Sequence, residues 1–542
     1  MAWPSGSRPP RRGGRAGLVL AIVLAVTAGV LAGSLWLRGS PSSPVPSGSA
    51  VRSGSPPPDA SPVASAHPAA TPEPSAAHIP LVVVGGFNDY KVTAITSATL
   101  KTRLAAGTLV VPCGAEAAVA LALGATGTGA APCVAADRIT AFLDPGSTDL
   151  ALIPPALVTP RVKVVPLESA DLFGQVSARQ KAYPLTIALP AIWPPAWSAW
   201  DGGDVRVVVT TGVTCPDRGV SLQTIVKGRG WGWLAEAGTA RVTGTHIDRR
   251  FGQRVVDLVR TGNLGAVRDL VGGADVAVSD FECAMTRNFK QHNSGTVFTI
   301  DPRVATLMAD IGFDVATVAA DHTTNAGIGA VGETVDFFRS AGVQPTGAGR
   351  TLDEALAPAI VDANGVKFGF VGFDAIGGAT SATSSSPGVA NLTTKNVKAA
   401  VARARAAGAQ VVIALVQWSS VEYQAKFTDF QLGVRKQLFA AGVDHIVGGD
   451  FHWAGALAIS LEGSTYHYAG ASQGNFWFDQ DWSRQTQEAV ITSLTFVGPR
   501  LVQVRLQPTV VVDNAQLNLT DPATDGQVVL NQVLSVSTLP PQ

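Results

Sequence analysis

The sequence has little charge and no excess of either sign. Asp, Glu, Lys and Arg make up 15% of the residues, and 40 basic side chains balance 40 acidic ones. Without a net positive field, nucleic acid is not expected as a partner. Hydrophobic residues reach 46% of a chain of 542 residues, which is enough to bury more than one core. We therefore expect a protein of two or three domains.

Charge is missing entirely from residues 17–37, which read GLVLAIVLAVTAGVLAGSLWL. A helix of this length spans the hydrocarbon core of a bilayer, at about 1.5 Å per residue. Arginines concentrate in residues 1–16, which predicts that this end is cytoplasmic. A cleaved signal peptide is the alternative, but its apolar run would be shorter, about 7–15 residues, with a cleavage site directly after it. We therefore expect an uncleaved single-pass membrane anchor, and the rest of the chain outside the cytoplasm under either interpretation.

Cysteine is scarce as well, since Cys113, Cys133, Cys215 and Cys283 are the only ones. An even number in an exported protein predicts two disulfides. Four cysteines allow three pairings. Cys113 and Cys133 lie in one local region of the chain.

Residues 38–200 are predicted to form a linker followed by a small domain. Residues 38–78 are rich in Pro, Ser and Ala without periodicity, which predicts a disordered linker. Residues 79–200 alternate short apolar runs with a helix predicted at 97–108, which indicates a small α/β domain. Their order of elements resembles part of a periplasmic substrate-binding protein of the phosphate-binding type. A spacer domain without a ligand is the alternative.

Residues 201–542 alternate apolar runs with helical stretches, which predicts an α/β domain. Three helices are predicted to end at Gly342, Gly408 and Gly442, where a left-handed residue closes a helix. Strands are predicted at 205–211, 275–279, 314–318, 367–373, 409–416, 443–447 and 465–470.

Polar residues follow these predicted strands. Open α/β sheets bind ligands at the carboxyl ends of their strands. The mixture of carboxylates, amides and imidazoles found there suits a one-metal or two-metal hydrolase. The residues concerned are Asp217, Asp280, Glu282, Asp321, His322, Gln417, Glu422, Asp450 and His452.

The order of these loops resembles the capsule-synthesis CapA family, which has a calcineurin-like metallophosphatase fold. The stretches that carry the resemblance are DFECAMT, AADHTTNAGIG, VQWSSVEYQ, GGDFHW and SQGNFWFD, in one collinear series. The resemblance implies an αββα sandwich for residues 201–542. It also implies that Asn475, in the Gly-Asn-Phe of the last stretch, lies in the cleft.

The sequence departs from the family pattern at positions that matter for metal binding. Gly212 stands where the family has a metal-binding Asp, and Asp217 lies too far along to be a sure substitute. Asp321 replaces an Asn, Gln417 replaces a His, and Asp450 replaces the first His of an HxH pair. Glu282, His322, His452 and Asn475 keep the residues that the family pattern implies.

Two interpretations of the cleft stay open, with a single weakly bound metal as the intermediate case. In one, Asp280, Glu282, Asp321, Asp450 and His452 form a retuned metal site for a hard ion such as Mn²⁺, Mg²⁺ or Ca²⁺. His322 is then the general acid and a metal-bound water the nucleophile. In the other, the site has lost its metals, and the neutral Gln417 is a poor replacement for a ligand. Gln417, Glu422 and Asn475 complete the expected cleft.

The resemblance also bears on the disulfides. Cys215 lies in the first strand-end loop and Cys283 directly follows Glu282 in the second. These loops are neighbours in the family's fold, which implies a Cys215–Cys283 disulfide that cross-links loops otherwise held by metals. Cys113 and Cys133 then form the other pair.

The function implied by the resemblance is synthesis, export or attachment of an anionic surface polymer of the poly-γ-glutamate type. The expected partners are that polymer or its synthesis and export machinery, together with the membrane. Two alternatives remain, namely an active metal-dependent phosphoesterase at the cell surface and a polymer-binding scaffold with a degenerate metal site.

Overall fold

The computed structural model describes residues 77–127, 133–143, 149–200, 202–418, 421 and 423–539. The predicted cytoplasmic segment 1–16, the anchor 17–37 and nearly all of the linker 38–78 lie outside these residues. None of the helices in the described ranges is long and apolar enough to cross a membrane. Residues Glu73–Gln542 form one compact unit.

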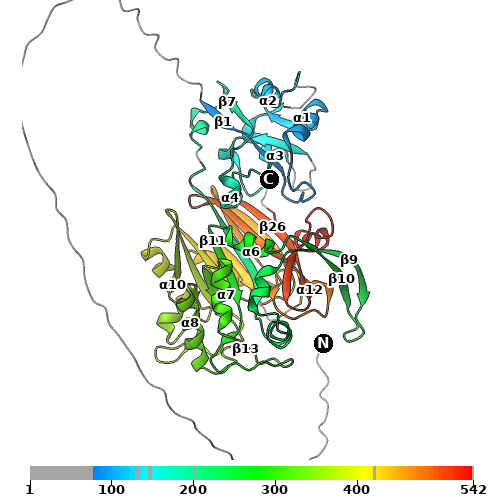
Figure 1. Ribbon diagram of the computed structural model, residues 1–542. Helices are drawn as coiled ribbons and strands as arrows, with labels where there is room; N and C mark the ends of the chain where they lie inside the picture. The colour runs from blue at the N-terminus through cyan, green and yellow to red at the C-terminus, as the bar shows by residue number, and fades with distance from the viewer. Residues whose placement is uncertain are drawn as a thin grey trace, which may run out of the picture. The chain divides into compact units, whose positions relative to one another are not determined.

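Two sheets dominate this unit (Figure 1). The ten-stranded sheet has the order β10 (Arg254–Gly262), β9 (Thr239–Ile247), β27 (Gln516–Leu519), β26 (Arg500–Val512), β25 (Glu488–Val497), β8 (Val205–Thr214), β11 (Val276–Phe281), β14 (Val315–Thr317) and β15 (Gln344–Thr346), and β24 (Asn475–Trp477) also pairs with β8. The six-stranded sheet has the order β17 (Ala359–Ala363), β18 (Val366–Asp374), β20 (Val411–Gln417), β21 (His445–Gly449), β23 (Thr465–Gly470) and β22 (Leu457–Glu462).

The central strands are apolar on both faces because both faces are buried. On β20, Val411, Ile413 and Leu415 enter the core between the two sheets, and the residues between them face the outer helices. The side chains of β8 alternate in the same way: Val208 lies in the core between the sheets, and Val207 and Val209 face the outer helices. Continuous apolar runs are what strands buried on both sides require.

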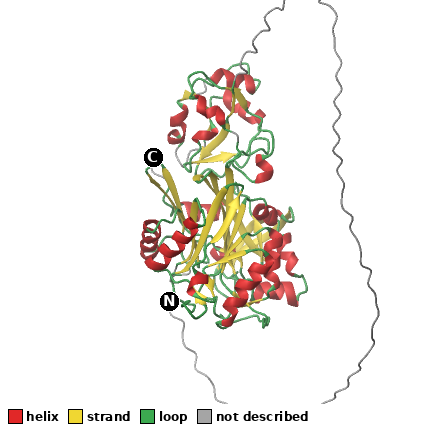
Figure 2. Cartoon of the chain, turned by 90° about the vertical axis from the view of Figure 1, so that its left-hand side faces the viewer, coloured by secondary structure: helices red, strands yellow, loops and turns green. Residues whose placement is uncertain are grey.

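Helices cover the outer faces of the two sheets, so the layers run helix, sheet, sheet, helix (Figure 2). The ten-stranded sheet carries α6 (Ala266–Gly272), α7 (Arg303–Ile311) and α8 (Gly329–Ala341), and the six-stranded sheet carries α10 (Thr394–Ala406) and α11 (Asp429–Ala440). The αββα sandwich expected for this region is therefore confirmed.

The remaining elements are short or lie in the N-terminal part. A five-stranded sheet has the order β4 (Cys133–Val134), β3 (Leu109–Pro112), β5 (Leu150–Ile153), β2 (Val82–Gly86) and β6 (Val162–Val165). The other helices and strands are β1 (His78–Pro80), β7 (Thr186–Ala188), β12 (Ala284–Met285), β13 (Thr299–Ile300), β16 (Ala348–Gly349), β19 (Gly388–Val389), α1 (Ser97–Ala105), α2 (Glu116–Ala122), α3 (Ile139–Phe142), α4 (Val176–Arg179), α5 (Arg218–Ser221), α9 (Leu352–Ala355), α12 (Arg484–Gln487), α13 (Gln527–Leu534), and the 3₁₀ or π turns η1 (Ala136–Arg138), η2 (Pro155–Leu157), η3 (Pro195–Ala199), η4 (Leu222–Val226) and η5 (Trp231–Glu236).

The five-stranded sheet packs against the larger sandwich. One of its faces shares a hydrophobic cluster with Val502 of β26. Arg179 binds Asp275 through two nitrogens, at 2.7 and 2.8 Å, and Arg505 lies 3.0 Å from Asp171. The predicted domain boundary near residue 200 stays a prediction, as does the likeness of 79–200 to a binding protein.

The predicted strands of the sandwich are confirmed to within a few residues. The predicted helix ends are confirmed too, because Gly342, Gly408 and Gly442 have φ of 91°, 89° and 94°. Helix α1 ends at Ala105, slightly before the predicted end.

His445, the first residue of β21, makes the stability of the fold depend on pH in the acidic range. The ring is 2% exposed, and its Nδ1 accepts a hydrogen bond from the Tyr468 amide at 3.1 Å. Burial, followed by the neighbouring His467, lowers the pKa of His445 from 6.5 to about 3. Between these two pKa values the unfolded chain binds the proton more tightly, so stability is lost as pH falls below 6.5.

We predict that His445→Asn, which keeps an acceptor for the Tyr468 amide, removes this loss. Between pH 7 and pH 5 the wild type should lose about 2 kcal/mol more free energy of unfolding than the variant. Urea unfolding at both pH values measures it. Parallel losses in the two proteins would show that His445 does not titrate as described.

Candidate functional site

The strands that carry the candidate residues end at one edge of the sandwich. Strands β8, β11 and β14 are parallel in one sheet, and β18, β20 and β21 are parallel in the other. In the register, Asp280 lies opposite Val213 and Thr317, and Gln417 lies between Asp374 and Gly449. Side chains that follow these strands therefore gather where both sheets expose their carboxyl ends.

Gln417 joins the two sheets at this edge. Its Nε2 donates hydrogen bonds to Glu282 Oε1 at 2.8 Å and to Asp450 Oδ1 at 3.3 Å. Glu282 follows β11 of the ten-stranded sheet, and Asp450 follows β21 of the six-stranded sheet. All three side chains are buried, with exposures of 2 to 6%. We call Asp280, Glu282, Asp321 and Asp450, together with Gln417, the carboxylate centre.

Like charges face one another in the carboxylate centre. Burial raises the pKa of Glu282 well above its usual value, and the charges of Asp280, Asp321 and Asp450 raise it further, against one hydrogen bond from Gln417. Burial and the charge of Asp321 raise the pKa of Asp280 to about 7. Protons or a cation are needed to relieve this repulsion.

Asp280 Oδ2 and Gln417 Oε1 are buried oxygens of the centre that have no hydrogen-bond partner among the described residues. A Cβ placed on Gly449 would stand 2.1 Å from the first and 2.8 Å from the second, so both oxygens press against this glycine. Asp450, the next residue, has φ of 79°, a conformation that is strained for a residue with a side chain. The backbone is thus bent to bring these acceptors together.

His452 is held in a fixed orientation beside the centre. Asn475 donates its Nδ2 to the Thr486 carbonyl at 2.9 Å, so its Oδ1 is the acceptor for His452 Nδ1 at 2.8 Å. With the proton on Nδ1, the neutral ring keeps a lone pair on Nε2, which is the form of His that ligates metals.

His322 is the more accessible imidazole, with 26% of its side chain exposed. Its Nδ1 lies 2.9 Å from Asn325 Oδ1, which also accepts the Phe298 amide, and its Nε2 lies 3.5 Å from Asp321 Oδ2. Because both ring nitrogens face oxygen acceptors, the ring can hold a proton on each and donate one.

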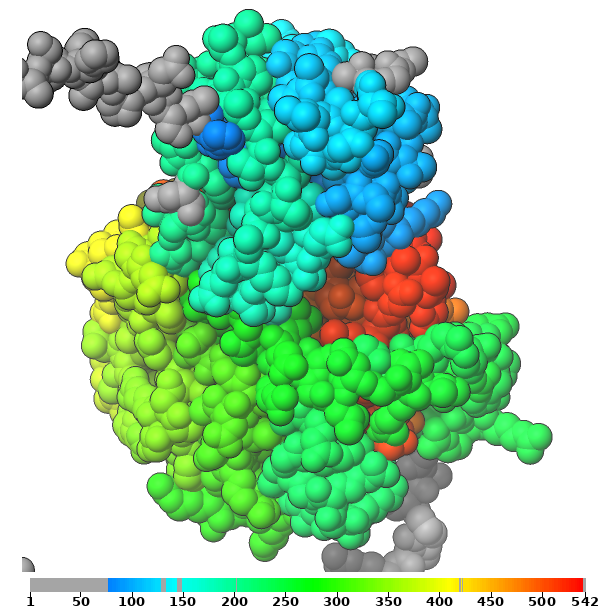
Figure 3. Space-filling view, turned by 45° about the horizontal axis from the view of Figure 1, so that its top comes forward, coloured from blue at the N-terminus to red at the C-terminus, as the bar shows by residue number. Residues whose placement is uncertain are grey.

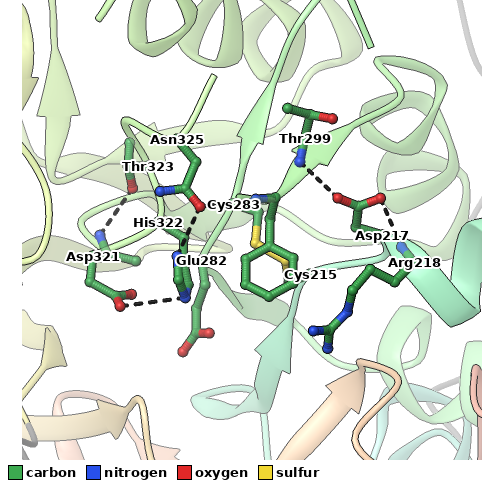
Figure 4. The surroundings of a disulfide bond; sticks show 12 residues. Cys215, Asp217, Arg218, Glu282, Cys283, Thr299, Asp321, His322, Thr323 and Asn325 are labelled. Carbon is green, nitrogen blue, oxygen red and sulfur yellow. Dashed lines mark hydrogen bonds and ion pairs between the residues drawn. A yellow bond between two sulfur atoms is a disulfide. The ribbon is translucent and has the colours of Figure 1, made fainter. Parts of the chain in front are cut away.

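The Cys215–Cys283 disulfide is present, as is Cys113–Cys133, so both expected pairs are confirmed. Figure 4 shows Glu282, Asp321 and His322 on one side of the Cys215–Cys283 bond and Asp217 on the other. The disulfide ties the loop after β8 to the loop that carries Glu282.

Asp217 has a structural task away from the centre. Its carboxylate accepts the Arg218 amide at 2.7 Å and the Thr299 amide at 2.8 Å, and it lies 2.8 Å from His292 Nε2. Gly212 leaves no room for the missing ligand, because a Cβ there would stand 1.9 Å from the Gly474 carbonyl oxygen. Glu422 lies outside the described residues.

Sequence reasoning missed the residues that orient the predicted ones. Asn325 holds His322, and Gly449 makes room for Asp280 and Gln417. Asp374, by contrast, was expected from the sequence at the end of a strand on this edge, and there its Oδ1 accepts the Ile376 and Gly377 amides at 2.9 and 3.0 Å. The i+3 spacing of Asn325 from His322 was the one usable signal.

The donors of the carboxylate centre fit a hard divalent cation in kind, since they are mainly oxygen atoms. They do not yet form a closed ligand sphere. Within the described ranges, the one set of three Cys, His, Asp or Glu ligand atoms lying within 4.8 Å of one another is that of Cys113, Glu116 and Cys133. The sulfurs of that set are joined to each other in a disulfide. The carboxylate side chains of the centre would therefore have to move closer together to coordinate an ion.

The sequence profile of the family described as "Bacterial capsule synthesis protein PGA_cap" matches residues 243–480. The capsule biosynthesis protein CapA of Bacillus anthracis is 25% identical over 209 residues, which are 38% of this chain and 50% of that protein. The PGA biosynthesis protein CapA of Bacillus subtilis is 26% identical over 229 residues, 42% of this chain and 59% of that protein. The chain thus spans about half the length of the curated relatives it matches.

Solved structures give only distant likenesses. A 5′-nucleotidase precursor from Thermus thermophilus is 13% identical, with 60% of this chain and 58% of that chain covered and a TM-score of 0.33. The calcineurin-like phosphoesterase YfkN from Bacillus subtilis is 14% identical, with 60% and 98% covered and a TM-score of 0.29. At these TM-scores the likenesses support no argument, and the two-sheet sandwich rests on its own strand pairing.

We predict that Glu282→Gln stabilises the chain when divalent ions are removed. The substitution keeps an acceptor for Gln417 but removes a charge whose pKa is raised in the fold. Between the pKa of the unfolded chain and the raised pKa of the fold, stability falls by about 1.4 kcal/mol for each step of one in pH. Unfolding in EDTA should show the variant gaining on the wild type between pH 5 and pH 8.

Glu333→Gln is the matched control. Burial alone would raise the pKa of Glu333, but hydrogen bonds from Thr286 and Arg287 outweigh burial and lower it. A lowered pKa contributes stability that is present at high pH, so this variant should fall behind the wild type as pH rises. The same sign in both variants would contradict the charge repulsion described for the centre.

Proposed function

We propose that this chain, a member of the CapA family through its residues 243–480, acts in making, exporting or attaching an anionic polymer at the outer face of a membrane. We propose further that the carboxylate centre takes one hard divalent cation. The carrying observation is the burial of Asp280, Glu282 and Asp450, with the partly exposed Asp321 beside them and with Asp280 Oδ2 and Gln417 Oε1 turned to the same glycine.

Three features favour one ion over a two-metal centre. Gly212 has no room for a side chain, so a ligand cannot stand there. Gln417 points an N–H donor at Glu282 and Asp450, and an N–H cannot ligate a cation. That donor also occupies the space between the two halves of the centre. Glu282, Asp280 and Asp450 are the residues that would hold the ion, with His452 beside them.

A bound cation would supply charge neutralisation and polarise an oxygen of the ligand. The chain's own residues orient the side chains of the site. Asn475 orients His452, and Asn325 orients His322, so neither imidazole has to reorganise when a ligand enters. The disulfide holds the Glu282 loop whether or not an ion is present.

The outer face of a membrane is proposed from the sequence of residues 17–37 and from the cysteines. Both disulfides are of the kind that persists in an oxidising compartment, which supports export of the folded part. The membrane anchor, the extracytoplasmic location, and the polymer or its export machinery as partners all belong to this proposal.

Titration of the full chain with Mn²⁺, after EDTA treatment, tests the cation. We expect one ion per chain by calorimetry and elemental analysis, and a melting temperature that rises with Mn²⁺ concentration. Glu282→Gln should weaken binding by about tenfold or more, since it removes one charged ligand, whereas Glu333→Gln should leave binding unchanged. Two ions per chain, or none, would contradict the proposal.

His322 supports a second candidate function, metal-dependent hydrolysis of a phosphoester. Its imidazole lies at the exposed side of the centre, with Nε2 3.5 Å from Asp321 Oδ2, which is the place for a general acid. If the chain hydrolyses bis(p-nitrophenyl) phosphate with Mn²⁺, we expect His322→Asn to lower kcat about 100-fold or more with little change in KM. A wild type that binds Mn²⁺ without turnover would leave the binding function and exclude hydrolysis of this substrate.

A further inference from the structure

A pair of arginines meets on one tryptophan, in a part of the molecule that the carboxylate centre does not use. Arg229 follows η4, Trp233 lies in η5, and Arg260 lies on β10 of the β9–β10 hairpin. The hairpin projects from the body of the molecule at the end of the ten-stranded sheet (Figures 1 and 3). Asp513, in the turn between β26 and β27, completes the group.

The two guanidinium groups converge on a single carboxylate oxygen. Their central carbons lie 4.4 Å (Arg229) and 5.9 Å (Arg260) from the centre of the Trp233 ring. Arg229 Nη1 is 3.3 Å and Arg260 Nη2 is 3.1 Å from Asp513 Oδ2. Arg260 Nη2 also lies 3.1 Å from Gln516 Oε1. Two positive charges thus share one negative charge.

The group is open to solvent and has donors to spare. The side chains of Arg229, Arg260 and Asp513 are 37, 36 and 35% exposed. A guanidinium carries five N–H donors, and these contacts with described residues engage one side-chain nitrogen of each arginine. Both guanidinium groups lie over the indole ring, Arg229 the closer of the two, and such a contact reduces the entropy lost when they bind an anion.

We propose that Arg229 and Arg260 bind carboxylate groups of a polymeric ligand, with the carboxylate of Asp513 standing in for one of them. A carboxylate already bridges the pair, which shows the chemistry that the pair accepts. The carboxylate centre itself repels an acidic chain, so such a ligand needs a positively charged contact elsewhere on the surface. The choice of a polymer as the ligand rests on the proposed function, whereas the geometry of the arginine pair is observed independently of it.

Three variants of the full chain test the proposal with poly-γ-glutamate as the probe. Arg229→Gln combined with Arg260→Gln should weaken binding about tenfold or more, because two charge-assisted contacts are lost. Asp513→Asn should strengthen binding several-fold, since it removes the competing carboxylate. Asn tolerates the left-handed conformation that Asp513 adopts, with φ of 55°, so the turn should be kept. Arg403→Gln, on α10 beside Asp353, is the control and should change nothing.

Calorimetry at two salt concentrations gives the readout, with thermal melts and Mn²⁺ binding measured on the same variants. Unchanged melts and Mn²⁺ binding would separate loss of the arginine site from loss of the fold or of the carboxylate centre. Equal binding by the double variant, or weaker binding by Asp513→Asn, would overturn the proposal. Anionic phospholipid vesicles or dextran sulfate that bind the arginine pair more tightly than poly-γ-glutamate would overturn the carboxylate assignment. Failure to bind poly-γ-glutamate at all would also overturn it, while one Mn²⁺ per chain would leave the cation proposal standing.

Discussion

The burial of three carboxylates, those of Asp280, Glu282 and Asp450, is the constraint on which the site depends. Glu282 comes from one sheet and Asp450 from the other, and the Gln417 side chain reaches both. Placing these acidic groups so deep costs free energy of folding, because burial and mutual repulsion both disfavour their charged forms. The sandwich tolerates this cost because three hydrophobic cores, one between the sheets and one beneath the helices on each outer face, hold the strands in place.

A disulfide and several hydrogen bonds hold the loops at this edge of the sandwich in place. The Cys215–Cys283 bond fixes the Glu282 loop from one side, and Asp217 anchors the adjacent turn through backbone amides. Asn475 and Asn325 each fix the proton of a neighbouring imidazole. These contacts join side chains and backbone of the chain itself, and the disulfide among them is covalent. Under the two proposals, the carboxylate centre would bind a cation and the arginine pair, at a separate place, would bind an anionic ligand.

The sequence predicted the strands well because they are buried on both faces and read as continuous apolar runs, whereas the two-sheet sandwich was expected from the family resemblance. It also indicated the strand-end residues and, through loop adjacency in a related fold, the pairing of Cys215 with Cys283. It could not predict that Gln417 bonds Glu282, since the two lie 135 positions apart and meet only when the sheets stack. The blocked space at Gly212 and the crowding at Gly449 are likewise properties of backbone approach, which residue patterns do not record. Asp217, which lies five residues beyond the position of the family's ligand, caps a turn.

The most direct measurement is anomalous X-ray diffraction from crystals of the chain soaked in Mn²⁺. The account predicts one anomalous peak at the carboxylate centre, at ligand distance of about 2.0–2.6 Å from oxygens of Asp280, Glu282 and Asp450. Two peaks about 4 Å apart would instead show a two-metal centre. A crystal with full Mn²⁺ exposure and no peak there would show that the centre is held by protons alone, and would contradict the account.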